Sequence, residues 1–156
     1  MVLKKKGKWW HASSGEDLDE YLLRYVLGRH CDGVPHRVTH ARCAVCGASK
    51  FDLYIDEGER IQRICTECEE EHNICDLDGQ WEEDSAGEIV CTCMYSECEV
   101  AVGFALMDAP EGCKEEAGPV CHLYVAGRCT ECGLCGVYSE WSPEGDYTFP
   151  EMAKSV

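Results

Sequence analysis

Large apolar side chains are scarce in this chain. Its 156 residues include only three Phe and four Trp, and 14 of its hydrophobic residues are cysteines. The length suits one ordinary domain or two small ones. A small domain with little core material usually depends on disulfides or on a structural metal. The cysteines are therefore expected to supply much of the stability.

A long hydrophobic run is also missing. The N-terminus MVLKKKGKWW is basic, but no apolar stretch follows it. We therefore expect neither a signal peptide nor a membrane-spanning segment, and hence a cytoplasmic protein. Persistent disulfides are rare in a reducing compartment, which favours reduced, metal-bound cysteines. A secreted, disulfide-bonded protein is the alternative.

Basic residues are few and unevenly placed. Lys and Arg total 14 against 30 Asp and Glu, for a net charge of −16. Lys4, Lys5, Lys6 and Lys8 lie among the first eight residues, which contain no acid. The rest of the chain carries 10 basic and 30 acidic residues, a net charge of −20. Such a body repels nucleic-acid phosphates and is complementary to a basic protein surface. We therefore expect a protein partner rather than nucleic acid.

Familiar catalytic signatures are absent from the sequence. No His is followed two residues later by Glu, and Arg128 precedes Cys129 where a zinc deaminase has Pro. The chain also lacks His-Glu-x-x-His, a phosphate-binding loop and Gly-x-Ser-x-Gly. We therefore predict no enzymatic activity.

Pairs of cysteines are what the sequence does have. Three pairs separated by two residues have the spacing with which a tight turn, here called a knuckle, presents two thiolates to one zinc ion. They are Cys43 with Cys46, Cys65 with Cys68, and Cys129 with Cys132. The first two pairs read C-x2-C-x18-C-x2-C, which predicts a four-cysteine zinc site.

The tetrapeptide Cys-Thr-Glu-Cys occurs twice and belongs to a longer internal repeat. Aligning its two copies and then Cys46 with Cys93 places Phe51 opposite Cys98. Cys91-Thr-Cys93 is then a shortened knuckle, and the gap between knuckles grows from 18 to 35 residues. In the second site Cys98 or Cys135 is an alternative to one member. The predicted ligands are Cys43, Cys46, Cys65 and Cys68 in the first site, and Cys91, Cys93, Cys129 and Cys132 in the second.

Six cysteines remain outside these two sites. Cys98 and Cys121 lie on predicted strands, where they are expected to be small buried apolar side chains. The others are free thiols or part of a further site with a histidine, for which His40, three residues before Cys43, is the nearest candidate. The six are Cys31, Cys75, Cys98, Cys113, Cys121 and Cys135, and the other histidines close in sequence are His30, His36 and His72.

The chain resembles the zinc-ribbon superfamily, in which two knuckles face each other across a β-hairpin with a third strand. The resemblance covers roughly residues 39–141. The resemblance implies a small metal-stabilised α+β fold, mainly β, with two tandem zinc ribbons and two zinc ions. An N-terminal amphipathic helix is expected in addition, from the periodicity described below. It indicates fold and metal rather than activity. The function that fits best is a non-enzymatic adaptor, regulatory or inhibitor module that binds a protein partner through an acidic surface.

Two other functions stay open. The knuckles are similar to those of rubredoxin, a small acidic electron carrier, and tetrahedral thiolate sites accept iron as well as zinc. The lysine cluster beside Trp9, Trp10 and His11 is also a candidate contact for nucleic acid. Adjacent Trp residues more often close a small core, however, and leading lysines usually fray.

Residue periodicity predicts one helix and several short strands. Ser13 and Glu16 have capping-box spacing, with Ser14 as an alternative N-cap, and an apolar stripe from Leu18 predicts a helix over 16–27. A loop is expected over 30–40. The predicted strands are 51–55, 60–64, 99–107, 122–126 and 134–141.

The resulting organisation has five parts. They are a basic tail and helix (1–35), a first ribbon (36–78), an acidic linker (79–88), a second ribbon (89–142) and an irregular tail (143–156).

Overall fold

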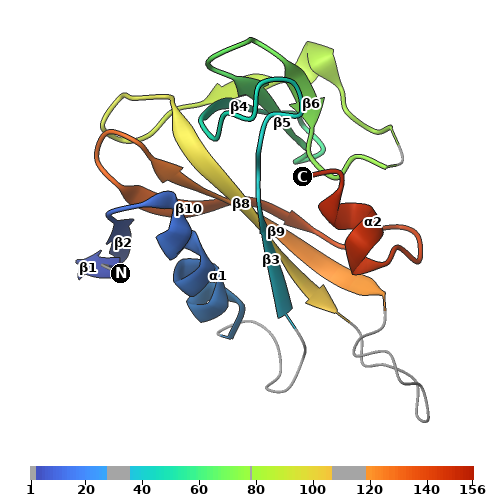
Figure 1. Cartoon of the computed structure of the whole chain (residues 1–156), viewed down its shortest axis with the longest axis horizontal. Helices are drawn as coiled ribbons and strands as arrows, with labels where there is room; N and C mark the ends of the chain where they lie inside the picture. The colour runs from blue at the N-terminus through green and yellow to red at the C-terminus, as the bar shows by residue number, and fades with distance from the viewer. Residues whose placement is uncertain (1–2, 28–35, 78, 107–118) are drawn as a thin grey trace.

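Residues 3–27, 36–77, 79–106 and 119–156 are described by a computed structural model of the chain. Most of the regular structure in these ranges is β-strand (Figure 1). The strands are β1 (Leu3–Lys6), β2 (Trp9–Ala12), β3 (His36–His40), β4 (Phe51–Ile55), β5 (Ile61–Cys65), β6 (Glu71–Asn73), β7 (Gly87–Ile89), β8 (Cys98–Leu106), β9 (Val120–Cys129) and β10 (Leu134–Trp141). The helices are α1 (Leu18–Leu27) and α2 (Phe149–Ala153), with 3-10 turns η1 (Gly15–Asp17) and η2 (Glu83–Ser85).

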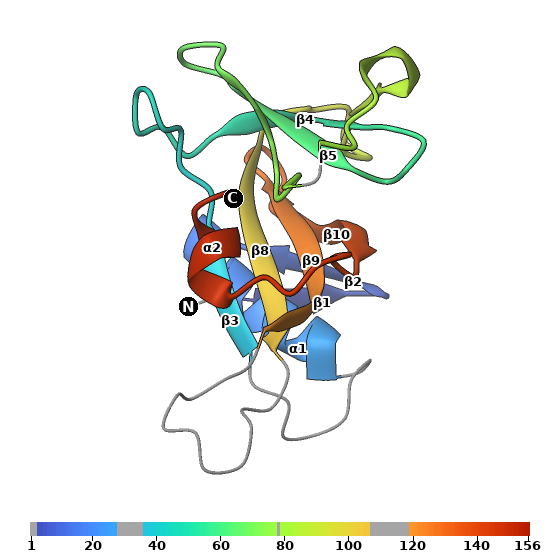
Figure 2. The ribbon, with the colours of Figure 1, turned by 90° about the vertical axis from the view of Figure 1, so that its right-hand side faces the viewer.

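The strands form one antiparallel sheet. Its order is β1-β2-β10-β9-β8-β4-β5-β6, while β3 also pairs with β8 and β7 with β4. Hairpin β4–β5 lies at one end of the molecule and α1 toward the other (Figure 2). Within the described ranges, no helix combines the length and apolar character needed to cross a membrane.

The long strands β8 and β9 carry the core on both of their faces. On one face Val100 packs in a cluster with Met152 of α2. On the other face Ala101 packs in a cluster with Leu18 and Leu22 of α1. Because neighbouring residues of a strand point to opposite faces, burial of both faces requires the near-continuous apolar run EVAVGFAL.

Several predicted elements are confirmed. Strands β4 and β10 have the predicted bounds 51–55 and 134–141, and the predicted helix over 16–27 is formed by η1 and α1. The predicted capping box is wrong. Ser14 is the N-cap but makes no side-chain cap hydrogen bond, and the Ser13 hydroxyl donates instead to Asp17, 3.3 Å away.

The expected loop over 30–40 is only partly testable, because residues 28–35 lie outside the described ranges. Its last part is wrong: residues 36–40 form β3, which pairs with β8 from His36 opposite Ala105 to His40 opposite Ala101. Short polar strands such as HRVTH carry little periodic signal. The open edge of β8 supplies the hydrogen bonds that define this one.

Three stretches expected to be irregular contain regular structure. The lysine-rich start forms the β1–β2 hairpin rather than a fraying tail. In the predicted linker and just beyond it, η2 and β7 form, and β7 pairs with β4. In the predicted irregular tail, Thr148 and Glu151 form a capping box that begins α2, and Met152 of this helix is buried.

Candidate metal centres

The structure brings the first four predicted ligands together. Their Sγ atoms all lie within 4.8 Å of one another. The Sγ atoms are 3.4 Å apart in Cys43 and Cys68, and 3.5 Å apart in Cys46 and Cys65. Tetrahedral zinc with Zn–S bonds of about 2.3 Å requires sulfurs about 3.8 Å apart. These four sulfurs can therefore hold one metal ion with only small adjustments.

The second four predicted ligands form an equivalent group. Their Sγ atoms also lie within 4.8 Å of one another. Cys91 and Cys132 are 3.5 Å apart, and Cys93 and Cys129 are 3.6 Å apart. The shortened knuckle with a single residue between its cysteines thus reaches the same sulfur spacing as the longer ones.

The two clusters are linked by the strand register. Phe51 pairs with Cys65 in the first hairpin, and Cys98 pairs with Cys129 in the second. The repeat aligns these two pairs with each other, so equivalent positions of the repeat occupy equivalent places in the two hairpins. Phe51 also pairs with Cys98, where β4 meets β8. An antiparallel pair has local two-fold symmetry, and here that symmetry relates one cluster to the other.

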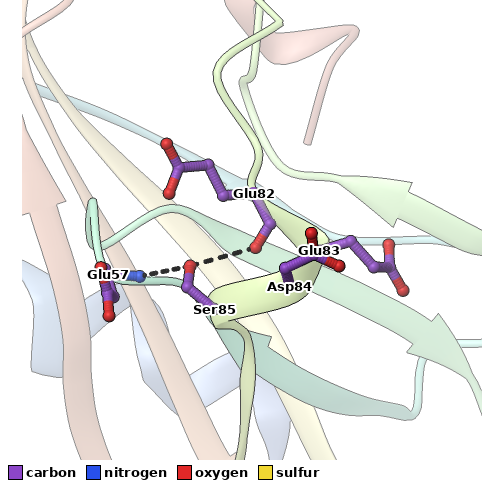
Figure 3. Close-up of a pocket in the computed structure, with 5 residues that line it drawn as sticks. All are labelled: Glu57, Glu82, Glu83, Asp84 and Ser85. Carbon is purple, nitrogen blue, oxygen red and sulfur yellow. Dashed lines mark hydrogen bonds between the residues drawn. The ribbon is translucent and has the colours of Figure 1, made fainter.

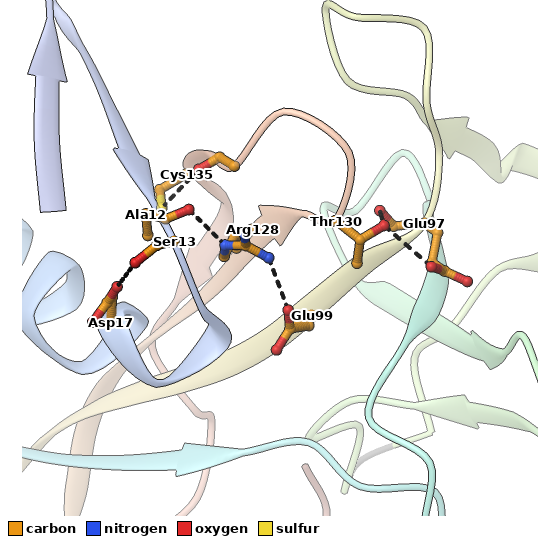
Figure 4. A network of polar contacts seen from close by, with 9 residues as sticks. Ala12, Ser13, Asp17, Glu97, Glu99, Arg128, Thr130 and Cys135 are labelled. Atoms are coloured by element: carbon orange, nitrogen blue, oxygen red, sulfur yellow. Dashed lines mark hydrogen bonds and ion pairs between the residues drawn. The ribbon is translucent and has the colours of Figure 1, made fainter. Parts of the chain in front are cut away.

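Hydrogen bonds beside the clusters follow the same symmetry. The backbone N–H and the hydroxyl of Thr66 both donate to the carbonyl of Lys50 at 3.2 Å. In the second hairpin the N–H and hydroxyl of Thr130 donate to the carbonyl of Glu97, also at 3.2 Å (Figure 4). The threonine of each Cys-Thr-Glu-Cys copy therefore ties its knuckle to the preceding strand.

Every knuckle ends with a residue of positive φ directly after its second cysteine. The N–H of each such residue donates to the carbonyl of the first cysteine at 2.8–2.9 Å. The four residues are Gly47 (77°), Glu69 (66°), Met94 (75°) and Gly133 (80°). Two of the four turns thus use a side-chain-bearing residue where glycine is favoured.

Replacing Met94 by glycine is expected to stabilise the protein. The left-handed conformation costs a residue with a Cβ about 1–2 kcal/mol, part of which is offset by the greater freedom of glycine in the unfolded chain. Met94 is 83% exposed, so little packing is lost. We expect the free energy of unfolding to rise by about 0.5 kcal/mol, measured by thermal or denaturant unfolding.

Two alanine substitutions are the matched controls. At Gly47 nothing lies within 4 Å of an added Cβ, so Gly47→Ala isolates the backbone strain. At Gly133 the Cβ would lie 2.5 Å from the carbonyl oxygen of Ala12, so Gly133→Ala should cost more. A lower stability for Met94→Gly, or equal losses at the two glycines, would contradict this account of the knuckles.

Hydrogen bonds from the backbone favour the thiolate form at one position of each cluster. The N–H of Cys68 is the main cause that lowers the pKa of Cys65 to about 7. Burial raises the pKa of Cys91, but the N–H of Cys93 and the neighbouring sulfurs outweigh it and bring the value to about 7.

At another position of each cluster the thiol keeps its proton. The N–H of Glu70 lowers the pKa of Cys68, yet neighbouring thiols and burial raise it to about 12. Burial and neighbouring thiols likewise raise the pKa of Cys132 to about 12. Four adjacent thiolates repel one another, so ionising all of them requires a cation between them, and a metal binds as the protons leave.

A buried arginine beside the first cluster was not singled out from the sequence. Arg63 is 2% exposed and its guanidinium lies 4.8 Å from the ring of Phe51. One nitrogen donates to the main-chain oxygens of Arg42 and Val156, while Nε and Nη1 have no partner among the described residues. The alternation in IQRIC was the available signal, because it places Arg63 on the same strand face as Cys65.

The charges around Arg63 connect it to the cluster. Burial lowers its pKa, and the negative charges of Glu70, Cys43 and Cys65 raise it in opposition. Binding a dication to four thiols leaves a site of charge about −2, which a nearby cation stabilises. Arg63 is thus placed to offset the charge of a metal-loaded first site.

The second cluster has no such cation at the equivalent position. The repeat aligns Arg63 with Gly127, and an added Cβ there would lie 2.5 Å from the ring of Tyr138. Burial raises the pKa of Tyr138, and the charges of nearby cysteines, Cys98 and Cys91 first among them, raise it further. A neutral phenol thus occupies the place that the guanidinium takes in the first hairpin.

The remaining cysteines of the described ranges lie outside both clusters. Cys75, Cys98, Cys121 and Cys135 donate to backbone carbonyls at 3.3–3.6 Å. Burial raises the pKa of all four, to about 12 for Cys75 and Cys135. They are protonated thiols, and Cys98 is buried as expected while Cys121 is only half-buried. Cys31 and Cys113 lie outside the described residues.

The histidines considered for a further site are otherwise engaged. His40 lies 2.6 Å from the carboxylate of Asp19, and His72 lies 2.9 Å from the carbonyl of Ser155. Neither belongs to a group of metal-binding side chains among the residues described. His30 and the side chain of His36 lie outside what the structure describes.

Comparison of the chain with known protein families, curated proteins and solved structures gives no match. The fold and the sites therefore define the class. This is a small, mainly antiparallel β protein with two four-cysteine clusters, each able to hold a metal ion, which is consistent with tandem zinc-ribbon-like sites.

Proposed function

We propose that this chain is a non-enzymatic protein stabilised by two zinc ions, which binds a protein partner through an acidic surface as an adaptor, regulator or inhibitor. The observation that carries the proposal is the pair of symmetry-related clusters of four sulfurs each. Sulfur ligands in tetrahedral groups of four are typical of structural zinc.

A closed shell of four thiolates argues against catalysis at these sites. Zinc enzymes keep one coordination position for water or substrate. Here each cluster supplies four sulfurs, which complete a tetrahedron. The chemistry that zinc supplies in such a site is the stabilisation of the fold.

Acidic side chains gather near the turn of the β4–β5 hairpin and η2. Glu57, Glu82, Glu83 and Asp84 line an open hollow there, held together by Ser85 (Figure 3). The N–H of Glu57 donates to the hydroxyl of Ser85 at 3.1 Å, and that hydroxyl donates to the carbonyl of Glu82 at 3.2 Å. These bonds hold together the main chain that carries the carboxylates, and a group of carboxylates on a chain of net charge −16 is complementary to a basic protein surface.

Metal content tests the first half of the proposal. We expect about two zinc per chain and no visible colour in protein purified without added metal, measured by elemental analysis and absorption spectroscopy. About two iron per chain with visible charge-transfer bands would contradict the zinc assignment and support the rubredoxin-like alternative. Metal-free protein that is fully folded would contradict both.

Charge neutralisation tests the second half. The wild-type chain should bind its protein partners at low salt and release them at high salt. The triple variant Glu57→Gln, Glu83→Gln, Asp84→Asn should no longer bind these partners at low salt. A control is Glu144→Gln with Glu151→Gln, which removes two negative charges elsewhere on the surface. If both variants retain the same partners as the wild type, the acidic hollow is not the binding surface.

A further inference from the structure

The N-terminal hairpin β1–β2 has two chemically different faces. Its register pairs Lys4 with His11 and Lys6 with Trp9. Residues directly opposite in an antiparallel pair share a face, so these four side chains lie together. Leu3, Lys5, Trp10 and Ala12 occupy the other face.

The second of these faces anchors the hairpin to the body. Ala12 is buried in the cluster around α1, and Leu3 and Trp10 pack against that cluster. The guanidinium of Arg128 donates to the carbonyl of Ala12 at 2.8 Å and to Glu99 at 2.9 Å (Figure 4). The two tryptophans are therefore not equivalent, since Trp10 closes the core and Trp9 does not.

The other face is cationic and aromatic. Trp9 is 52% exposed, and the ammonium of Lys8 lies 5.0 Å from the centre of its ring. Lys4, Lys6 and Lys8 are exposed, and no ion pair with any described residue involves them. This set, together with His11, is called the hairpin face below.

We propose that the hairpin face binds single-stranded nucleic acid, with the lysines contacting phosphates and one base stacking on Trp9. Proteins that bind single strands combine a basic track with exposed aromatic rings, and each stacked base contributes about 1–3 kcal/mol. The carboxylates of an acidic peptide would be attracted by the lysines alone and offer no aromatic plane that stacks on the ring of Trp9. The exposed ring beside three lysines therefore favours a base over a carboxylate.

The acidic body does not cancel this local charge. Charges are largely screened beyond about 8 Å at physiological ionic strength. The hairpin also ends the sheet order at β1, whereas the β4–β5 hairpin with its acidic hollow belongs to the other end of that order (Figure 1). The proposal is independent of the metal assignment and of the basic protein partner proposed above.

Fluorescence anisotropy with a labelled 15-nucleotide oligothymidylate tests the proposal on the full metal-loaded chain. We expect saturable binding at 50 mM salt that weakens steeply toward 200 mM. Trp9→Ala should weaken it about tenfold, and Lys4→Gln with Lys6→Gln should weaken it and reduce the salt slope by about 1–2. Lys50→Gln, an exposed lysine outside the hairpin, should leave binding unchanged. Circular dichroism verifies that each variant keeps its fold.

Three results would overturn the proposal. One is the absence of saturable binding at 50 mM salt. Another is binding that Trp9→Ala and the double lysine variant both leave unchanged. The last is competition by poly-glutamate as effective as that by unlabelled oligonucleotide, which would assign the hairpin face to an acidic protein partner instead.

Discussion

Removing the metal is expected to unfold most of the protein. Treatment of the zinc-loaded chain with a strong chelator should abolish the cooperative thermal transition and most of the β-sheet circular dichroism signal. The physical reason is that both clusters lie where strands of the sheet begin or end, so that Cys65 closes β5 and Cys129 closes β9. Without the ion, adjacent thiols repel one another when ionised, and the binding free energy that stabilises the fold is lost.

Single substitutions separate the two sites. Cys65→Ser and Cys129→Ser should each remove about one of two zinc ions and lower the melting temperature by more than 10 °C, because loss of a structural metal belongs to the most destabilising changes. Cys121→Ser is the matched control, since this half-buried thiol only donates to the carbonyl of Ala105 at 3.3 Å. Unchanged zinc content in both cluster variants would show that the ligand assignment is wrong.

Substitution of Arg63 should weaken metal retention at the first site alone. Arg63→Met keeps much of the side-chain volume but removes a buried cation next to a site of charge about −2. Loss of a residue that supports a metal site typically lowers metal affinity 10–100-fold. We therefore expect one of two zinc ions to transfer to a chromophoric chelator at least ten times faster than in the wild type.

Cysteine alkylation followed by peptide mass spectrometry identifies the site that opens. Cys43, Cys46, Cys65 and Cys68 should become reactive first in the variant, while the second cluster reacts as in the wild type. Arg63→Lys retains the charge and should restore much of the retention. Arg60→Met is the control for the loss of a cation from the same hairpin, since Arg60 stacks on Trp141 at 4.8 Å. Equal zinc release from both sites, or none, would exclude the role of Arg63.

The sequence was most informative where the chemistry is local. Two cysteines two residues apart meet in one turn whatever the rest of the chain does, so the composition of both clusters could be predicted, including the shortened Cys91–Cys93 knuckle. The alternation of FDLYI and its return strand likewise predicted the β4–β5 hairpin. The division of the chain into two ribbons and a linker stays a prediction.

The elements that could not be predicted are those defined by distant partners. Strand β3 exists because β8 offers an open edge. In the described part of the chain the lysine-rich β1 pairs with β2 alone, and β2 joins β10 through two residue pairs. Helix α2 carried a capping signal at Thr148 that was not recognised. Sequence alternation could place Arg63 on the inner face of its strand, but its contacts with the main-chain oxygens of Arg42 and Val156 depend on packing between distant segments.

By itself, the sequence determined the two sets of four sulfur ligands and the internal repeat that contains them. It also determined that a basic N-terminal segment precedes an acidic body. Those properties follow from residue type and short spacing, which hold in any fold. The tertiary structure decided how they are used. It related the clusters by the Phe51–Cys98 register, placed the buried cation of Arg63 beside the first of them, and separated Trp9 from Trp10. These outcomes depend on contacts between residues far apart in the chain, and short-range patterns carry no information about such contacts.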